Sequence, residues 1–244
     1  MQNHLHYDCL DSTSIRLKQL IATSAKPLDA FFTITAGKQE RGRGRQTKSW
    51  ESEPEKNLLM SVLLYPKYAP QQQFYVCRSI SLAVVEFLSK QIRIENVSIK
   101  WPNDIYVGNK KIAGILIEHF LQGNKINYSI AGVGLNVNQG VFSENLPNPT
   151  SIFLETNKEF SPFFCMEELM KNIKELSKTD FAALEETYEQ FLYKKNEYAS
   201  FLIPKISTSP IDAKIKGVTE NGLLRISDKD DNLIFCSLDE VVYL

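Results

Sequence analysis

The sequence predicts an α+β protein in which a mixed sheet packs against helices and a small all-β unit follows at the C-terminal end. Segments with apolar residues at helical spacing flank a central series of short strand-like segments. After residue 196 the sequence pattern changes to five short apolar runs, which are separated by Asn-Gly and Asp-Asn turns. That last pattern is typical of a small closed β-barrel.

The first half of the chain alternates helical and strand patterns. Ser12 stands before the first helical pattern as an N-cap candidate. Pro66 closes a buried apolar strand. The predicted elements are a helix over 14–24, a strand over 31–36, an irregular loop over 40–50, a strand over 57–65 and a long helix over 71–92.

The second half is first rich in strands, then helical, then all-β. Turn residues separate the strand-like runs. We place a boundary near Lys194, which predicts an α+β domain over 1–194 and a β-barrel over 195–244. The predicted elements are strands over 97–101, 105–107, 111–120 and 126–136, helices over 159–177 and 180–194, and barrel strands over 200–206, 212–218, 222–227, 232–238 and 240–244.

Composition excludes several classes of protein. The chain has 244 residues, enough to bury a sizeable core without a disulfide or metal staple. Its 28 basic and 29 acidic residues give a net charge of −1, which argues against general nucleic-acid affinity. The most apolar run, 58–64, is too short to cross a bilayer, and the N-terminus lacks the pattern of a signal peptide. The four cysteines show no metal-ligand spacing. We therefore expect a cytoplasmic protein without membrane contact.

One local basic cluster stands out against this neutral background. The run Gly42-Arg43-Gly44-Arg45 precedes Lys48 and Trp50. Glycines let a backbone approach a ligand closely, and arginines offer planar donors to phosphate or carboxylate. The loop lacks the Gly-Lys-Ser/Thr ending of a Walker loop. Arg-Gly runs also occur in RNA-binding tails, so the pattern alone indicates an anion site of unspecified kind.

Two further motifs lie in the strand-rich region. The first is KWPND at 100–104, followed by KKIAGILIE at 110–118, in which Lys111 begins a strand that Gly114 interrupts. The second is AGVGLNVN at 131–138, where two glycines precede Asn136. Each motif alone is compatible with a purely structural role, either in forming a turn or in placing glycines where a strand packs closely against its neighbours.

Taken in order, these motifs resemble the biotin–protein ligase family over nearly the whole chain. The matching pieces are DSTS at 11–14, Gln39 with the GRGR run and Trp50, KWPND, KKIAGILIE and GVGLNVN. The resemblance implies a class II synthetase-like, biotinyl/lipoyl-ligase catalytic domain followed by an SH3-like barrel. It also implies activation of biotin by ATP to biotinyl-5′-AMP, and transfer to a lysine of the biotin carboxyl carrier protein of acetyl-CoA carboxylase or a related carboxylase.

The resemblance also assigns roles to residues of this chain. No protein ligand to a metal is expected, because Mg²⁺ is carried by ATP. The catalytic residues would be Lys111, Arg43, Arg45 and Asp104; the biotin-binding residues Ser12, Thr13, Ser14, Gln39, Gly42, Arg43, Gly44, Arg45, Lys111 and Gly114; and the nucleotide-binding residues Arg45, Lys48, Trp50, Asn103 and Asn136.

Two features set this sequence apart from the family pattern. Thr47 and Lys48 stand where the family loop usually has a second Gly-Arg pair. The chain also begins almost directly at the Ser-Thr motif, so we expect a ligase without the DNA-binding helix-turn-helix of some members.

Other interpretations of the sequence stay open at this stage. One is a lipoate or octanoyl ligase of the same fold, and another is a nucleic-acid-binding module built on the Arg-Gly loop. A biotin-sensing regulator would need a DNA-binding element, which is not found. The expected partner is a carrier domain, and a sheet edge is compatible with a homodimer.

Overall fold

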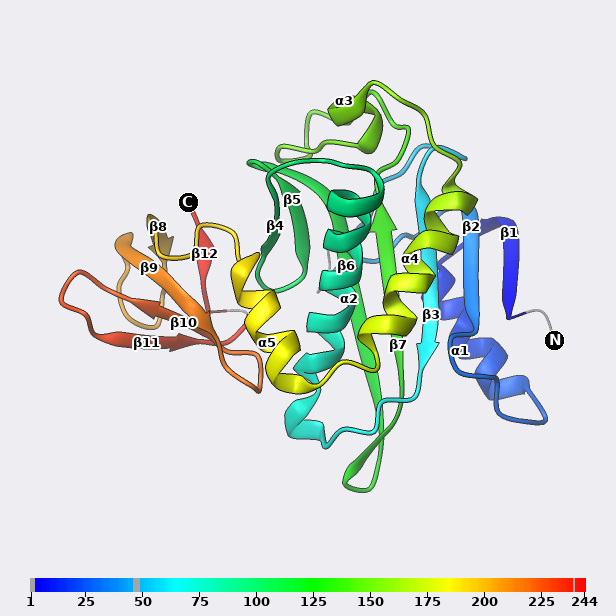
Figure 1. Ribbon diagram of the computed structural model, residues 1–244, viewed down its shortest axis with the longest axis horizontal. Helices are drawn as coiled ribbons and strands as arrows, with labels where there is room; N and C mark the ends of the chain where they lie inside the picture. Colours follow the sequence, from blue (N-terminus) through cyan, green and yellow to red (C-terminus); the bar gives the residue numbers. More distant parts are fainter. Residues whose placement is uncertain (1–2, 46–48, 239) are drawn as a thin grey trace.

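A seven-stranded mixed sheet forms the centre of the larger part of the molecule (Figure 1). The computed structural model describes residues 3–45, 49–238 and 240–244. The strand order is β1-β2-β3-β7-β6-β5-β4; β1 and β2 are parallel, and the other neighbours are antiparallel. The predicted α+β class with a mixed sheet is confirmed. The strands are β1 (His4–Leu10), β2 (Thr33–Gln39), β3 (Leu58–Leu64), β4 (Val97–Lys100), β5 (Asp104–Val107), β6 (Lys110–Gln122) and β7 (Lys125–Leu135).

Helices cover both faces of this sheet (Figure 1). Nearly every side chain of α2 (Phe74–Glu86) is buried, because this helix packs on the sheet with α4 (Pro162–Leu176) on one side and α5 (Phe181–Gln190) on the other (Figure 1). On the opposite face, α1 (Thr13–Thr23) buries Leu17 against β2, β3 and β7. A 3-10 turn (Pro70–Gln72) precedes α2 and a π-type turn (Phe87–Gln91) follows it, so the predicted helix over 71–92 is continuous apart from these irregular ends.

The described residues include no helix with the length and apolar character that crossing a membrane requires.

The C-terminal segment forms a second, five-stranded antiparallel sheet, consistent with an SH3-like unit. Its order is β11-β10-β9-β8-β12. A β-bulge between Arg225 and Ile226 shifts the register of β9 and β10. The strands are β8 (Tyr198–Leu202), β9 (Ile211–Val218), β10 (Leu224–Ser227), β11 (Leu233–Cys236) and β12 (Val242–Tyr243).

The two sheets share one hydrophobic core. Phe201 and Ile215 of the small sheet belong to the same buried cluster as the side chains of α2 and β6. The indole Nε1 of Trp101 donates to the carbonyl of Gly222 at 3.1 Å, which joins the end of β4 to the β9–β10 turn. The predicted boundary near Lys194 falls in the connection between α5 and β8 and stays a prediction.

Two elements were not predicted from the sequence. The strand β1 lies at the edge of the large sheet, where all its side chains are exposed or half-buried, so HLHYDCL carries no apolar signal. The helix α3 (Ile152–Thr156) has only five residues. The Ser151 side chain caps its start by accepting from Leu154 N, and Asn157 ends it in the left-handed conformation.

Candidate active site

A pocket of about 1050 Å³ extends from the N-terminus of α1, across β6 and β7, to the last residues of the chain. Pockets of this size commonly bind small molecules or cofactors in proteins. Its walls come from α1, the 40–50 loop, the KWPND turn and the C-terminal sheet. The pocket therefore brings together segments that are far apart in the sequence.

Hydroxyl groups crowd one end of the pocket. The backbone N and the Oγ1 of Thr13 donate to Gln39 Oε1 at 2.8 and 3.1 Å. The Ser61 hydroxyl lies 2.8 Å from Thr13 Oγ1 and 2.9 Å from Ser14 Oγ. These groups surround the N-terminus of α1, where backbone N–H groups favour a ligand that accepts hydrogen bonds. Ser61 was not predicted; its only signal is a single polar residue within the apolar strand β3.

The floor of the pocket is a pair of glycines beneath a tryptophan ring. Gly114 of β6 and Gly134 of β7 are partners in register. A Cβ atom at Gly114 would lie 2.9 Å from Trp50 Cζ3, and one at Gly134 would lie 2.5 Å from Trp50 Cε2. Trp50 is held from the other side, because its backbone N donates to Gly42 O at 2.9 Å. The glycines thus leave the space that the indole occupies.

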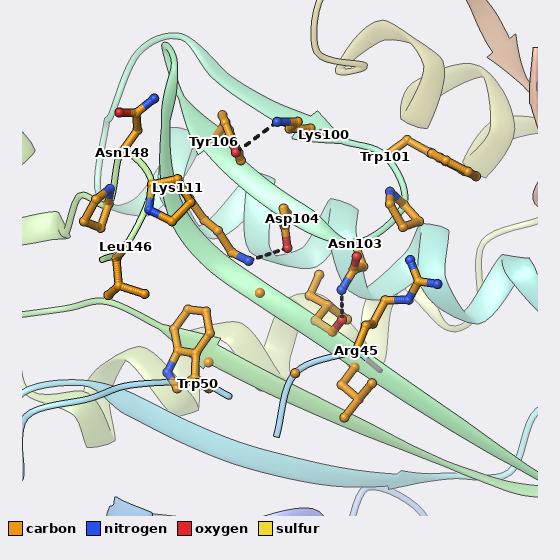
Figure 2. Close-up of a pocket in the computed structure, with 18 of the residues that line it drawn as sticks. Arg45, Trp50, Lys100, Trp101, Asn103, Asp104, Tyr106, Lys111, Leu146 and Asn148 are labelled. Carbon is orange, nitrogen blue, oxygen red and sulfur yellow. Dashed lines mark hydrogen bonds and ion pairs between the residues drawn. The ribbon is translucent and has the colours of Figure 1, made fainter. Parts of the chain in front are cut away.

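A lysine–carboxylate pair lies at the centre. Lys111 Nζ is 2.7 Å from Asp104 Oδ1 (Figure 2), and both side chains stay about one-quarter to one-third exposed. The Lys111 ammonium also lies 5.6 Å from the centre of the Trp50 ring. Asn103 fixes the turn that carries Asp104, because its Nδ2 donates to Ile115 O at 2.6 Å. A partly exposed ammonium beside an aromatic ring can accept an anionic ligand with little rearrangement.

Arg43 and Arg45 of the loop point in different directions. The backbone at Arg43 pairs with Ser49 in an antiparallel bridge, and the Arg43 guanidinium lies 3.8 Å from Glu118 Oε1. The Arg45 side chain points toward the Pro102–Asp104 turn in Figure 2. Burial raises the pKa of the Cys77 thiol below this turn to about 11, and the Arg45 charge is among the weaker influences that lower it.

The far end of the pocket holds a lysine surrounded by tyrosines. Lys100 Nζ donates to Tyr106 Oη at 3.2 Å (Figure 2). The ring centres of Tyr106, Tyr193 and Tyr243 lie 4.9, 5.9 and 4.9 Å from this ammonium. Burial, followed by the Asp104 carboxylate, raises the pKa of Tyr106 to about 12. The tyrosines come from three separate segments, so no spacing along the chain predicts that they meet.

Most of the predicted site residues line this one pocket. Gly42 is not part of its lining, but it is close-packed, because a Cβ atom there would collide with the Trp50 carbonyl. Asn136 is 4% exposed and its amide donates to Thr150 O, so it also supports the loop that follows β7. Lys48 lies outside the described residues. The lining includes Ser12, Thr13, Ser14, Gln39, Arg43, Gly44, Arg45, Trp50, Asn103, Asp104, Lys111, Gly114 and Asn136.

Metal-ligating side chains do not gather in the described part of the chain. Within residues 3–45, 49–238 and 240–244, no group of three or more His, Cys, Asp or Glu side chains could hold a metal ion.

The pocket has donor hydroxyls at one end, an ammonium–carboxylate pair at the centre and loop arginines beside that pair. These features are typical of an enzyme that binds and activates a small molecule, and the pocket has room for an anion. The family model of the biotin/lipoate A/B protein ligase family matches residues 8–136. This chain belongs to that family.

Individual relatives agree with this membership. The bifunctional ligase/repressor BirA of Bacillus subtilis (strain 168) is 33% identical over 138 residues, which cover 57% of this chain and 41% of the relative. Biotin–protein ligase 2 of Arabidopsis thaliana is 30% identical over 217 residues, covering 81% of this chain and 62% of the relative. The chain thus matches about two-fifths of the length of BirA.

A solved structure covers the whole chain. The biotin protein ligase of Aquifex aeolicus in complex with biotin and ATP aligns with a TM-score of 0.79 and 26% identity, over 100% of this chain and 99% of the other.

Proposed function

We propose that this chain is a biotin–protein ligase, which activates biotin with ATP and transfers it to a lysine of a carrier protein. The observation that carries the proposal is the pair of Lys111 and Asp104, which lines the same pocket as the hydroxyl end and lies beside the Trp50 ring. The similar structure from Aquifex aeolicus is a complex with biotin and ATP. The two parts of the pocket are lined by different kinds of side chain, which suits two different ligands that meet at its centre.

Biotin occupies the hydroxyl end in this proposal. The ureido group of biotin both donates and accepts hydrogen bonds, and Ser12, Thr13 and Gln39 offer hydroxyl and amide groups of both kinds. The valeryl chain then extends along the pocket and brings the carboxylate to Lys111.

In the first step, a biotin carboxylate oxygen attacks the α-phosphorus of ATP. The bond between the α-phosphorus and the bridging oxygen breaks, and pyrophosphate leaves with the electron pair. Two anions must approach each other, so fixed positive charges are the main requirement. Lys111 exchanges part of its contact with Asp104 for the carboxylate and the phosphate, and Arg45 adds a second charge from the loop.

The nucleotide lies on the other side of Lys111. Trp50 offers an aromatic face, and Asn103 and Asn136 border the same space. Mg²⁺ enters with ATP and offsets the charge of the polyphosphate.

In the second step, the carrier lysine attacks the acyl carbon of biotinyl-5′-AMP. The new bond is an amide, the bond from carbon to the phosphate oxygen breaks, and AMP leaves with the electron pair. The attacking amine must be neutral, so the lysine ammonium first gives up a proton to solvent, and the second proton that the nitrogen loses as the amide forms also passes to solvent. Asp104 is placed to orient this amine and to accept a hydrogen bond from it.

The carrier is a biotin carboxyl carrier domain, the partner expected of these ligases. We place the activity in the cytoplasm; all four cysteines are free thiols, as is usual in a reducing compartment.

Mass spectrometry of a carrier domain tests the proposal. Incubation with the protein, ATP, Mg²⁺ and biotin should add one biotin to one lysine, and omission of ATP should abolish the addition. Lipoate in place of biotin is the matched comparison, because a lipoate ligase of the same fold would prefer it. Addition of lipoate with no addition of biotin would overturn the assignment.

A further inference from the structure

Glu118, the last residue of the KKIAGILIE motif, lies just outside the pocket and contacts two cations. Its Oε1 is 2.6 Å from Lys18 Nζ of α1 and 3.8 Å from Arg43 Nη1 of the loop. Its Oε2 is buried and has no hydrogen-bond partner among the described residues. A guanidinium can donate to both oxygens of one carboxylate, so this oxygen leaves a place for a second donation from Arg43.

The position of Glu118 links three elements that build the site. On β6, alternate residues point to the same face, and Gly114 and Leu116 line the pocket on the face that also carries Glu118. Lys18 lies one helical turn after Ser14, which belongs to the hydroxyl end. Glu118 therefore ties α1 and the arginine loop to the strand that carries Lys111.

The contact of Arg43 with Glu118 also indicates that Arg43 and Arg45 have different roles. A guanidinium that is held beside Glu118 cannot at the same time neutralise anions at Lys111. Arg45 instead points to the turn that carries Asp104 (Figure 2), where the proposed reaction brings the anions together.

We infer that Glu118 is a positioning residue that holds Arg43 against β6, so that Arg43 anchors the loop around biotin and Arg45 serves the reacting anions. This inference rests on the proposed function and refines the sequence-based assignment of Arg43 as a catalytic residue.

Kinetics of biotin-dependent pyrophosphate exchange test the inference through Glu118→Gln and Arg43→Met. An anchoring contact acts on ligand affinity, and partly exposed ion pairs are weak, so each variant should raise the KM for biotin by roughly three- to fivefold. The kcat should stay within about twofold of the wild type. The double variant should be no worse than either single one, because both remove the same contact. Arg45→Met should instead lower kcat.

Lys18→Met is the matched control, since it removes the other cation from the same carboxylate. It should leave the KM for biotin unchanged, whereas a general loosening around Glu118 would raise it as well. Arg43→Met replaces a half-exposed side chain and provides the test if Glu118→Gln folds poorly. A wild-type KM in Arg43→Met, a fall in kcat in Glu118→Gln, or effects that multiply in the double variant would each refute the anchoring role.

Trypsin cleavage of the ligand-free protein gives a readout that does not depend on catalysis. Glu118→Gln should speed cleavage after the arginines of the loop relative to the wild type and to Lys18→Met. If no carrier is biotinylated by the wild type, the proposed function fails while this comparison still decides whether Glu118 anchors the loop. Equal cleavage rates in all three proteins would overturn the anchoring.

Discussion

Lys111 lies where charge repulsion between the substrates would be greatest. Its ammonium is 2.7 Å from Asp104 and faces the Trp50 ring, so it is held without being buried. Removal of one charge-stabilising donor typically costs about 3 kcal/mol in the transition state. Lys111→Ala should therefore slow adenylate formation by roughly two decades or more.

Pyrophosphate exchange in the presence of biotin measures this step. Lys110→Ala is the control, because Lys110 is the preceding residue and its more exposed side chain pairs with Glu155 instead. The control should stay near the wild-type rate. A nearly normal rate in Lys111→Ala would show that another group bears the charge.

Arg45 provides a second prediction at the residue scale. Its side chain reaches from the loop to the turn that carries Asp104 (Figure 2). Arg45→Gly removes that bridge and one positive charge beside the phosphate, so the intermediate should be held less tightly. We expect free biotinyl-5′-AMP to accumulate in solution. Chromatography of the reaction without carrier checks this, and intermediate that stays protein-bound would contradict it.

At this scale the sequence predicts residues that belong to compact motifs. Asn103 lies in the turn before β5, Asp104 begins β5 and Lys111 lies near the start of β6, so residues that are close in the sequence are also close in the pocket. Ser61 and Tyr243 were not predicted, because each meets other residues of the site only through the folding of distant segments.

The elements β6 and β7 illustrate how paired glycines create a binding floor. Gly114 and Gly134 face each other in register, and the indole of Trp50 rests above them. In Gly134→Ala, the new Cβ atom would lie 2.5 Å from Trp50 Cε2, which real contacts do not allow. Overpacking of this kind costs about 1–3 kcal/mol, and here the ring can escape only by leaving the floor.

Gly134→Ala should therefore raise the KM for ATP and change the tryptophan fluorescence of the free protein. Gly140→Ala is a suitable control, because its Cβ atom would meet Phe153 at an ordinary 3.6 Å. An unchanged KM for ATP in Gly134→Ala would show that Trp50 does not contribute to nucleotide binding.

Elements with a clear hydrophobic period could be predicted, whereas edge elements could not. Nearly every side chain of α2 is buried and β3 is buried throughout, so both have an apolar pattern that a sequence displays. The strand β1 pairs with β2 through its backbone and through hydrogen bonds of His4 and His6 with Thr35 Oγ1, and its side chains carry no apolar pattern.

On the scale of the whole molecule, one buried arginine adds a second side-chain link to the one that Trp101 makes with the small sheet. Arg78 of α2 is 0% exposed, and its Nη2 donates to Val218 O and Thr219 O at 2.9 and 3.2 Å. Its Nη1 donates to Glu185 Oε2 at 3.4 Å. Aromatic rings, including that of Tyr188, enclose the guanidinium. The hydrophobic core continues across the same contact, so we expect the molecule to unfold in one cooperative transition.

Arg78→Met tests this coupling, because it preserves apolar bulk but removes the donors to two backbone carbonyls of the small sheet. Loss of one side of a buried polar contact should lower the free energy of unfolding by about 3 kcal/mol. Urea denaturation followed by tryptophan fluorescence measures the change. Lys90→Met, which breaks an exposed pair with Glu86 in the turn after α2, should change stability by less than about 0.5 kcal/mol. If the wild type unfolds in two separate steps, the two sheets are independent units. If Arg78→Met is as stable as Lys90→Met, the buried arginine does not couple them.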